Sequence, residues 1–285
     1  MHGGHSGSYC DHATGSLEEV LQSALEKGFS VYGTSEHVPR LGERYLYENE
    51  RNLGWTLDKI IDDFSRYAED SRALVRQFED RLHVLRGYEI EVVPEDRYAT
   101  VMRDYRREHG FDYMVGSVHF MADISIDGPR DQFEDALKHF GGLENLAVRY
   151  YECVAQMIQT LEPEVVGHLD LIRKNGHFYG PVDTPAIREA ALRTLETVRQ
   201  SGAILDLNTA GWRKGLDSPY PAPWIVTEAN AMGIPFCFGD DSHGPNDVGA
   251  GVDDARVYLL NLGVTDITGL ARQNGAVQKR VVNLQ

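Results

Sequence analysis

Hydrophobic and polar positions along the chain alternate between helical spacing and short β-rich runs. In residues 14–29, TGSLEEVLQSALEKGF, apolar side chains recur every three or four positions, which predicts an amphipathic helix. Ser16, with Glu19 three residues later, forms a capping box that predicts the start of this helix, and Gly28 predicts its end. The next segment, residues 29–37 (FSVYGTSEH), is a β-rich run that ends in polar side chains.

The same helix-then-strand pattern recurs along the rest of the chain. The predicted helix and strand pairs are 56–78 with 82–93, 98–110 with 111–120, 144–163 with 164–172, 184–202 with 203–211, and 221–233 with 234–243. This alternation predicts an α/β fold with a mostly parallel sheet and helical crossovers. No G-x-G-x-x-G follows the first strand, so a dinucleotide fold has no support. We expect one domain over 1–285, a (β/α) barrel, with residues 38–55 as a loop that caps its site.

Composition limits the function classes. The chain has 285 residues, 42% of them hydrophobic, and a formal net charge of −16, which argues against nucleic-acid or anionic-membrane partners. An anionic substrate stays open, because bound metal ions reverse the local field. The chain has three cysteines, Cys10, Cys153 and Cys237, which are scattered and form no C-x-x-C motif, as is typical of a reduced, intracellular protein. Neither a membrane span nor a signal peptide is evident, so we expect a cytoplasmic protein. Nothing in the pattern indicates an oligomeric state.

Residue types that bind metals stand at or near the ends of the predicted strands. They are His37, Glu89, His119, His168, Asp241 and His243, with His12 just before the first helix. In a barrel the C-terminal ends of the strands converge, so these side chains are expected to form one cluster. Imidazole and carboxylate together suit Zn²⁺, Mn²⁺ or Fe²⁺, and two or three such ions, bridged by Glu89, would suit the hydrolysis of phosphate esters.

Basic side chains lie close in sequence to these candidate ligands. Arg40 follows His37, and Arg173 and Arg213 stand in the segments GHLDLIRK and LNTAGWRK. A guanidinium group can donate two parallel hydrogen bonds to the oxygens of one phosphate, which makes these three arginines candidates for phosphate contacts. The alternative is that they form salt bridges with nearby acidic residues.

Several segments taken together resemble a known family. They are HSGSYCDHA, SEHVPR, GYEIE, GSVHF, GHLDLIRK, LNTAGWRK and GDDSHGPNDVG, between about residues 2 and 252. In this order they resemble the polymerase-and-histidinol-phosphatase (PHP) superfamily, and within it the monofunctional histidinol-phosphatases of the fungal type. The resemblance implies a distorted (β/α)7 TIM-like barrel.

The resemblance also implies a trinuclear metal site. One ion would be held by His12, His37 and His243, a second by Glu89, His119 and His168, and a third by Glu89, Asp241 and the histidines of an N-terminal H-x-H motif. Arg40, Arg173 and Arg213 would contact the phosphate and the substrate.

The H-x-H motif is incomplete in this chain. His5 matches its second histidine, whereas Gly3 stands where the first is expected. His2 is adjacent, but on a regular strand its side chain would point the opposite way. A weakened metal site, a substitute role for His2 allowed by the neighbouring glycines, and an inactive relative all stay open. Cys10 and Asp11 are interpreted as packing and turn residues.

The leading hypothesis is a hydrolase that converts L-histidinol phosphate to L-histidinol and phosphate in histidine biosynthesis. A water molecule activated by the ions would attack phosphorus, and Asp241, His243 or another water would protonate the leaving oxygen. The expected partner is therefore a small phosphorylated substrate. Another phosphomonoesterase, a nucleic-acid phosphodiesterase and a metal-binding relative without catalysis are the alternatives.

Overall fold

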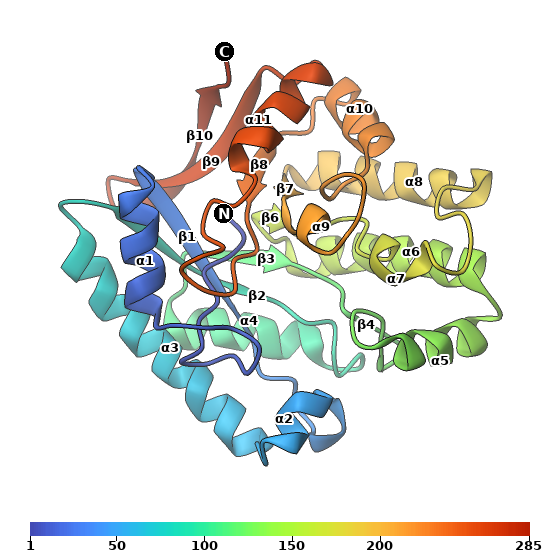
Figure 1. The fold of residues 1–285 in the computed structure, drawn as a ribbon, viewed down its shortest axis with the longest axis horizontal. Coiled ribbons are helices and arrows are strands. Elements are labelled where there is room, and N and C mark those ends of the chain that lie inside the picture. Colours follow the sequence, from blue (N-terminus) through green and yellow to red (C-terminus); the bar gives the residue numbers. More distant parts are fainter.

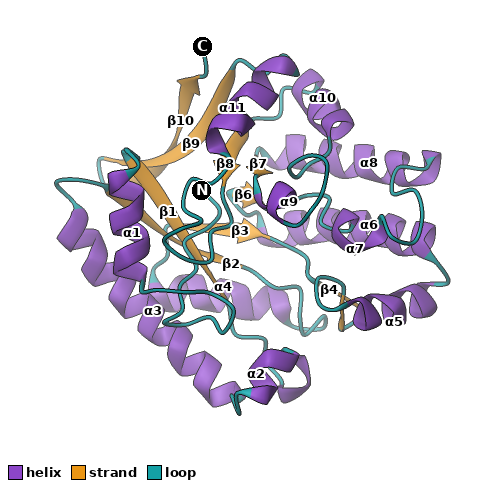
Figure 2. Ribbon diagram, in the orientation of Figure 1, coloured by secondary structure: helices purple, strands orange, loops and turns teal.

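A curled parallel sheet forms the centre of the computed structural model, which describes residues 1–285 (Figure 2). The sheet has six strands in the order β1-β2-β3-β6-β7-β8, so each crossover leads to the neighbouring strand. The strands are β1 (Val31–His37), β2 (His83–Glu89), β3 (Tyr113–Gly116), β6 (Val165–Val166), β7 (Ile204–Asn208) and β8 (Phe236–Gly239). Right-handed strand twist curls such a sheet toward a barrel, and the distorted α/β barrel expected from the sequence is confirmed.

The N-terminal segment, residues 1–5, lies between the two edge strands, β1 and β8, near the centre of the molecule (Figure 1). The Ser35 amide donates to the Gly3 carbonyl at 2.8 Å, and the Asp240 amide donates to the His2 carbonyl at 3.0 Å. These bonds link both edges through a segment that is not a regular strand. The segment therefore takes the place of a seventh strand in the barrel.

Seven helices form the outer layer around the sheet (Figure 1). They are α1 (Leu17–Glu26), α3 (Leu57–Phe78), α4 (Tyr98–His109), α6 (Leu143–Leu161), α8 (Pro185–Ser201), α10 (Pro223–Ala231) and α11 (Val252–Asn261). The predicted capping box is present, because Ser16 caps α1 and Glu19 reaches back to the Ser16 amide. The apolar faces of the helices and the outward-facing strand residues form the main hydrophobic core.

A second, smaller core fills the inside of the curled sheet. Its buried members include Leu85 on β2, Tyr113 on β3 and Ile204 on β7. A C-terminal antiparallel hairpin of β9 (Asp266–Gln273) and β10 (Ala276–Asn283) adds Leu270 to this core, with Val277 packed against it. The hairpin therefore closes the inside of the sheet on the side away from the strand ends that carry the candidate ligands.

Short elements follow the C-terminal ends of the strands. They are η1 (Glu43–Tyr45), α2 (Glu48–Asn52), β4 (Phe120–Met121), β5 (Ile124–Ser125), α5 (Arg130–Phe140), α7 (Arg173–Gly176) and α9 (Ala210–Arg213). They belong to the strand-to-helix loops, where barrels carry their functional residues. No helix in the structure combines the length and the apolar character that a membrane crossing requires.

Candidate metal centre

Glu89, the last residue of β2, stands in the middle of a ring of imidazoles. Its Oε1 atom is 3.1 Å from Nε2 of both His2 and His168 and 3.5 Å from Nε2 of His119. Its Oε2 atom is 3.0 Å from Nδ1 of His37. Parallel pairing aligns the strand ends, so residues distant in sequence meet at one carboxylate.

His2 lies in the position that the incomplete H-x-H motif left open. Residues 1–5 are irregular, since Gly3 and Gly4 have φ angles of 146° and 79°, and strand alternation therefore does not apply to His2. The His2 side chain is buried, and its Nδ1 atom donates to Asp206 Oδ2 at 2.8 Å. A Cβ atom on Gly3 would lie 2.0 Å from Asp240 Oδ1, so this backbone path requires glycine.

Two further glycines provide the space that His2 occupies. A Cβ atom on Gly239 would lie 2.1 Å from Asp206 Oδ1 and 2.9 Å from His2 Cβ. A Cβ atom on Gly167 would lie 3.1 Å from His2 Cε1. The inner faces of β8 and of the segment after β6 are therefore shaped around this imidazole.

Buried carboxylates orient two more imidazoles in the same way. His5 Nδ1 donates to Glu36 at 3.2 Å, and His119 Nδ1 donates to Glu91 at 3.1 Å. An ionised carboxylate only accepts hydrogen bonds, so each Nδ1 carries a proton, and Nε2 is the nitrogen left to face a cation. The sequence alone did not point to Glu36, Glu91 or Asp206. Their signal is an acidic residue inside an otherwise apolar strand segment.

The electrostatic environment keeps the central carboxylate ionised. Burial raises the pKa of Glu89, but His2 and His119 outweigh it and hold the pKa well below its usual range. Burial lowers the pKa of His119, whereas Glu91 and Glu89 more than compensate and raise the pKa to about 9. Burial is the main cause that lowers the pKa of His243 to about 3, so this imidazole is neutral.

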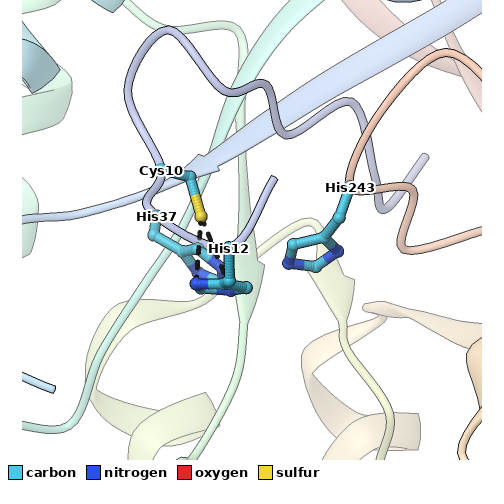
Figure 3. Close-up of side chains that lie close together, drawn as sticks. All are labelled: Cys10, His12, His37 and His243. Carbon is cyan, nitrogen blue, oxygen red and sulfur yellow. Dashed lines mark hydrogen bonds between the residues drawn. The ribbon is translucent and has the colours of Figure 1, made fainter. Parts of the chain in front are cut away.

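The structure gathers all eight predicted ligands into overlapping clusters. The clusters, within each of which the ligand atoms lie within 4.8 Å of one another, are His2, His5 and Glu89; His2, His168 and Asp241; His5, Asp241 and His243; Glu89, His119 and His168; and Cys10, His12, His37 and His243. The last of these is drawn in Figure 3. Cys10 was not predicted as a ligand from the sequence, and the role of His2 was left open.

The residues present fit divalent transition metals. Several buried ring nitrogens have no hydrogen-bond partner: His5 Nε2, His168 Nδ1 and His37 Nε2. A buried polar atom without a partner is costly, and a cation would satisfy it. Imidazole and carboxylate groups together form the donor set of zinc, manganese and iron sites.

The turn after β8 positions the last two predicted ligands. Asp241 has a φ of 46°, a left-handed conformation that costs energy for a residue other than glycine. The Asp241 amide donates to the His2 carbonyl at 2.9 Å, and the Arg213 guanidinium donates to the Asp241 carbonyl at 3.0 Å. His243 Nδ1 lies 2.9 Å from the same carbonyl oxygen. Contacts on both sides therefore hold this strained turn in place.

An open cavity of about 340 Å³ lies over the cluster. Its metal-type lining residues are His12, His37, Glu89, His119, His168, Asp241 and His243. The loop 38–55 adds Tyr47, Glu48 and Asn49, and other loops add Asp127, Lys174, Lys214 and Tyr220. The cavity thus joins the candidate ligands to both basic and acidic side chains.

The three arginines expected to contact phosphate are not among the residues that line this cavity. The Arg40 guanidinium is buried and paired with Glu50, and that of Arg173 donates to Asp170 at 3.0 Å. Arg213 donates to main-chain oxygens of the β8 turn. Salt bridges, the alternative named above, account for the first two. The lysines adjacent to Arg173 and Arg213 in sequence line the cavity instead.

Comparisons with known proteins place this geometry in context. Residues 3–210 match the family model of the PHP domain. The probable histidinol-phosphatase of Schizosaccharomyces pombe is 32% identical over 289 residues, with 97% of this chain and 92% of the relative covered. The probable histidinol-phosphatase of Deinococcus radiodurans is also 32% identical, with 91% of this chain and 92% of the relative covered.

Solved structures agree on the fold. A Listeria monocytogenes protein described as a candidate histidinol phosphatase matches with a TM-score of 0.77 at 28% identity, covering 89% of this chain and 99% of that chain. A histidinol phosphate phosphatase of Lactococcus lactis, solved with zinc, L-histidinol and phosphate, matches with a TM-score of 0.71 at 17% identity and 97% coverage of both chains. At that identity the second likeness shows the fold alone.

Proposed function

The chain belongs to the PHP domain family, and on that premise we propose that it is a histidinol-phosphatase, which hydrolyses L-histidinol phosphate to L-histidinol and phosphate in histidine biosynthesis. The observation that carries the proposal is the ring of imidazoles around Glu89, open to a cavity with lysines on its wall. Curated relatives that match this chain over nearly its whole length are named histidinol-phosphatases, which supports the substrate.

The proposed cofactors are two or three divalent ions. The residues proposed to hold them are His2, His5, His12, His37, Glu89, His119, His168, Asp241 and His243. When bound, such ions polarise phosphoryl oxygens and make water a stronger nucleophile at neutral pH. Buried carboxylates fix the imidazoles that would bind them, so little reorganisation is needed during the reaction.

Charged side chains on the cavity wall suit both ends of the proposed substrate. Lys174 and Lys214 bring positive charge to the wall, in a protein whose net charge is −16, and they are the proposed phosphate contacts. Lys174 Nζ donates to Asp127 at 2.7 Å, which holds this ammonium at the wall. Asp127 and Glu48 also line the cavity and suit the ammonium and imidazole groups of histidinol.

Asp241 and His243 are the proposed residues that handle the proton of the leaving alcohol. Both line the cavity, and His243 Nδ1 lies 3.7 Å from Asp241 Oδ1. Protonation is required because an alkoxide is a poor leaving group at neutral pH. The β8 turn presents both side chains to the same space.

Phosphate release from histidinol phosphate, a nucleoside monophosphate and a phosphodiester, measured after supply of Mn²⁺ or Zn²⁺, tests this proposal. We expect histidinol phosphate to be hydrolysed with the highest kcat/KM. His119→Ala should lose activity by roughly 100-fold or more. The control is His139→Ala, an exposed histidine of α5, which should behave as the wild type.

Two outcomes would contradict the proposal at different points. Equal turnover of the three substrates would remove the assignment of histidinol phosphate. Equal activity of His119→Ala and the wild type would remove the metal centre from the reaction.

A further inference from the structure

Tyr220 is buried beside the cavity, and its hydroxyl has no partner within the protein. The residue is 1% exposed, it is one of the residues that line the cavity, and its Oη atom makes no hydrogen bond. Other buried tyrosines satisfy this group. Tyr88 Oη donates to the Met102 carbonyl at 2.7 Å, and Tyr67 Oη donates to the Gly87 carbonyl at 2.6 Å. A buried hydroxyl without a partner is costly, so this one requires an explanation.

The surrounding residues hold the Tyr220 ring in place. Tyr220 exchanges two main-chain hydrogen bonds with Asn208, at the end of β7, with lengths of 2.7 and 3.0 Å. The guanidinium carbon of Arg173 lies 6.0 Å from the centroid of the ring, and this guanidinium donates to Asp170 and Ser218. The fold therefore fixes the position of the hydroxyl, and a partner has to be brought to it by a ligand.

The neighbours of the Tyr220 hydroxyl place it beside the candidate metal centre. The Tyr220 ring meets the His168 ring edge to face, with centroids 6.1 Å apart, and His168 Nε2 lies 3.1 Å from Glu89 Oε1. Burial raises the pKa of the Tyr220 hydroxyl well above its usual range, and the carboxylates of Asp127 and Asp241, which both line the cavity, raise it further. The hydroxyl keeps its proton at neutral pH, so it is available as a hydrogen-bond donor.

The charges near this hydroxyl favour an anion as the acceptor. Burial raises the pKa of Asp127, but Lys174 and Lys214 outweigh it and lower the pKa, so both ammonium groups lie near this carboxylate. Lys174 Nζ donates to Asp127 Oδ1 at 2.7 Å, which neutralises the carboxylate, and Lys214 adds a further positive charge. Hydrogen bonds to an anionic acceptor such as a phosphate oxygen are about twice as strong as those between neutral groups.

We propose that the Tyr220 hydroxyl donates a hydrogen bond to the phosphate group of the substrate, alongside Lys174 and Lys214. The inference rests on the proposed phosphatase function and deepens it, because it assigns a substrate contact to a residue that had no role. Lysine side chains are flexible point charges, whereas a hydroxyl on a fixed ring orients the phosphate that it binds. No group of the protein uses the Oη atom, so Tyr220→Phe keeps the packing of the ring and removes only the substrate contact.

Phosphate binding by Tyr220→Phe tests this contact. The Mn²⁺-loaded enzyme is titrated with inorganic phosphate by isothermal titration calorimetry, and kcat/KM is measured for histidinol phosphate. We expect both phosphate affinity and kcat/KM to fall roughly 10-fold or more, as for the loss of a hydrogen bond to a charged group. The inhibition constant of L-histidinol, which carries no phosphate, should stay unchanged, and so should the number of bound ions and Tm.

Tyr88→Phe is the matched control, because it removes a buried hydroxyl that has a protein partner and lies on a ring outside the cavity. This variant should have a lower Tm but the phosphate affinity and kcat/KM of the wild type.

Three outcomes would overturn the contact. They are a wild type that binds no phosphate, a Tyr220→Phe variant with the phosphate affinity of the wild type, and a Tyr220→Phe variant that loses bound ions or has a lower Tm. The last would show that the hydroxyl serves the metal centre or the core. Failure of the proposed function looks different: phosphate binding would still depend on Tyr220, but histidinol phosphate would be hydrolysed no better than other phosphate esters.

Discussion

At the scale of single residues, the position of His2 depends on one buried carboxylate. Asp206 Oδ2 accepts a hydrogen bond from His2 Nδ1 at 2.8 Å and is itself fully buried. In Asp206→Asn the amide side chain has nearly the same shape as the carboxylate, but it no longer stabilises the tautomer of His2 that carries its proton on Nδ1. We expect metal affinity or kcat to fall about 10- to 100-fold, with little change in Tm. Isothermal titration with the metal and steady-state kinetics measure the two effects.

An exposed carboxylate provides the matched control for this variant. Asp62 lies on the solvent side of α3, and Asp62→Asn should leave metal affinity, kcat and Tm unchanged. A wild-type metal affinity and kcat in Asp206→Asn would show that Asp206 does not position His2.

Restoring the expected H-x-H motif should harm this protein. Gly3→His would place a Cβ atom 2.0 Å from Asp240 Oδ1, on a backbone with a φ of 146°. We expect the variant to displace residues 1–5, lower Tm and bind less metal, and inductively coupled plasma mass spectrometry can count the ions. A variant that binds an additional ion and gains activity would contradict the assignment of His2 to this position.

The sequence predicted the strand-end ligands because a parallel sheet brings such positions together wherever they lie along the chain. It could not decide the position of His2, because strand alternation does not apply to a segment whose backbone follows Gly3 and Gly4. Arg40 and Arg173 were assigned to phosphate because the formation of a buried pair with Glu50 or Asp170 depends on loop conformation. Whether the individual ligands bind metal stays a prediction.

At the scale of elements, the loop 38–55 is anchored by Arg40. The guanidinium pairs with buried Glu50, donates to the Tyr45 carbonyl at 3.0 Å and lies 3.8 Å from the centroid of the Tyr47 ring. Arg40→Ala leaves the Glu50 carboxylate buried and unpaired, which costs about 3–5 kcal/mol. We expect a lower free energy of unfolding in urea and a higher KM, since this loop lines the cavity.

Arg44 in the same loop offers a control, because its ion pair with Asp123 is exposed. Arg44→Ala should change stability little, as surface pairs contribute little. An Arg40→Ala variant with normal stability but a severe loss of kcat would instead favour the phosphate contact that the sequence suggested.

The spacing of hydrophobic residues identified most of the helices and strands, because an element that is buried on one face has apolar side chains at regular intervals. The strand expected within 164–172 is only Val165–Val166, since the chain then turns to bring His168 to the metal centre. The C-terminal hairpin was missed because most side chains of β10 are exposed and show no clear alternation. The capping role of residues 38–55 stays a prediction.

At the scale of the whole molecule, the candidate ligands range from His2 to His243 and come from both edges of the sheet. Bound ions should therefore cross-link the native state. An ion present at 100 times its Kd stabilises by about 2.7 kcal/mol, which corresponds to roughly 5–10 °C in Tm for a domain of this size. We expect a chelator to lower Tm by this amount for each ion removed, as measured by calorimetry.

Adding Mn²⁺ or Zn²⁺ in excess of the chelator should restore the original Tm. An unchanged Tm after complete removal of metal, verified by elemental analysis, would contradict the cross-linking role. At this scale the cytoplasmic location stays a prediction.

The position of residues 1–5 between β1 and β8 determines when the metal centre can form during synthesis. This segment is synthesised before its neighbours on β8, which end at residue 239, more than 200 residues later in the chain. Contacts so distant in sequence form late in folding, because a long loop must close before they form. A segment that is synthesised before the whole sheet is thus among the last to reach its place in the fold. A protein molecule that retains the full set of ions must therefore have a sheet that is completely synthesised and assembled.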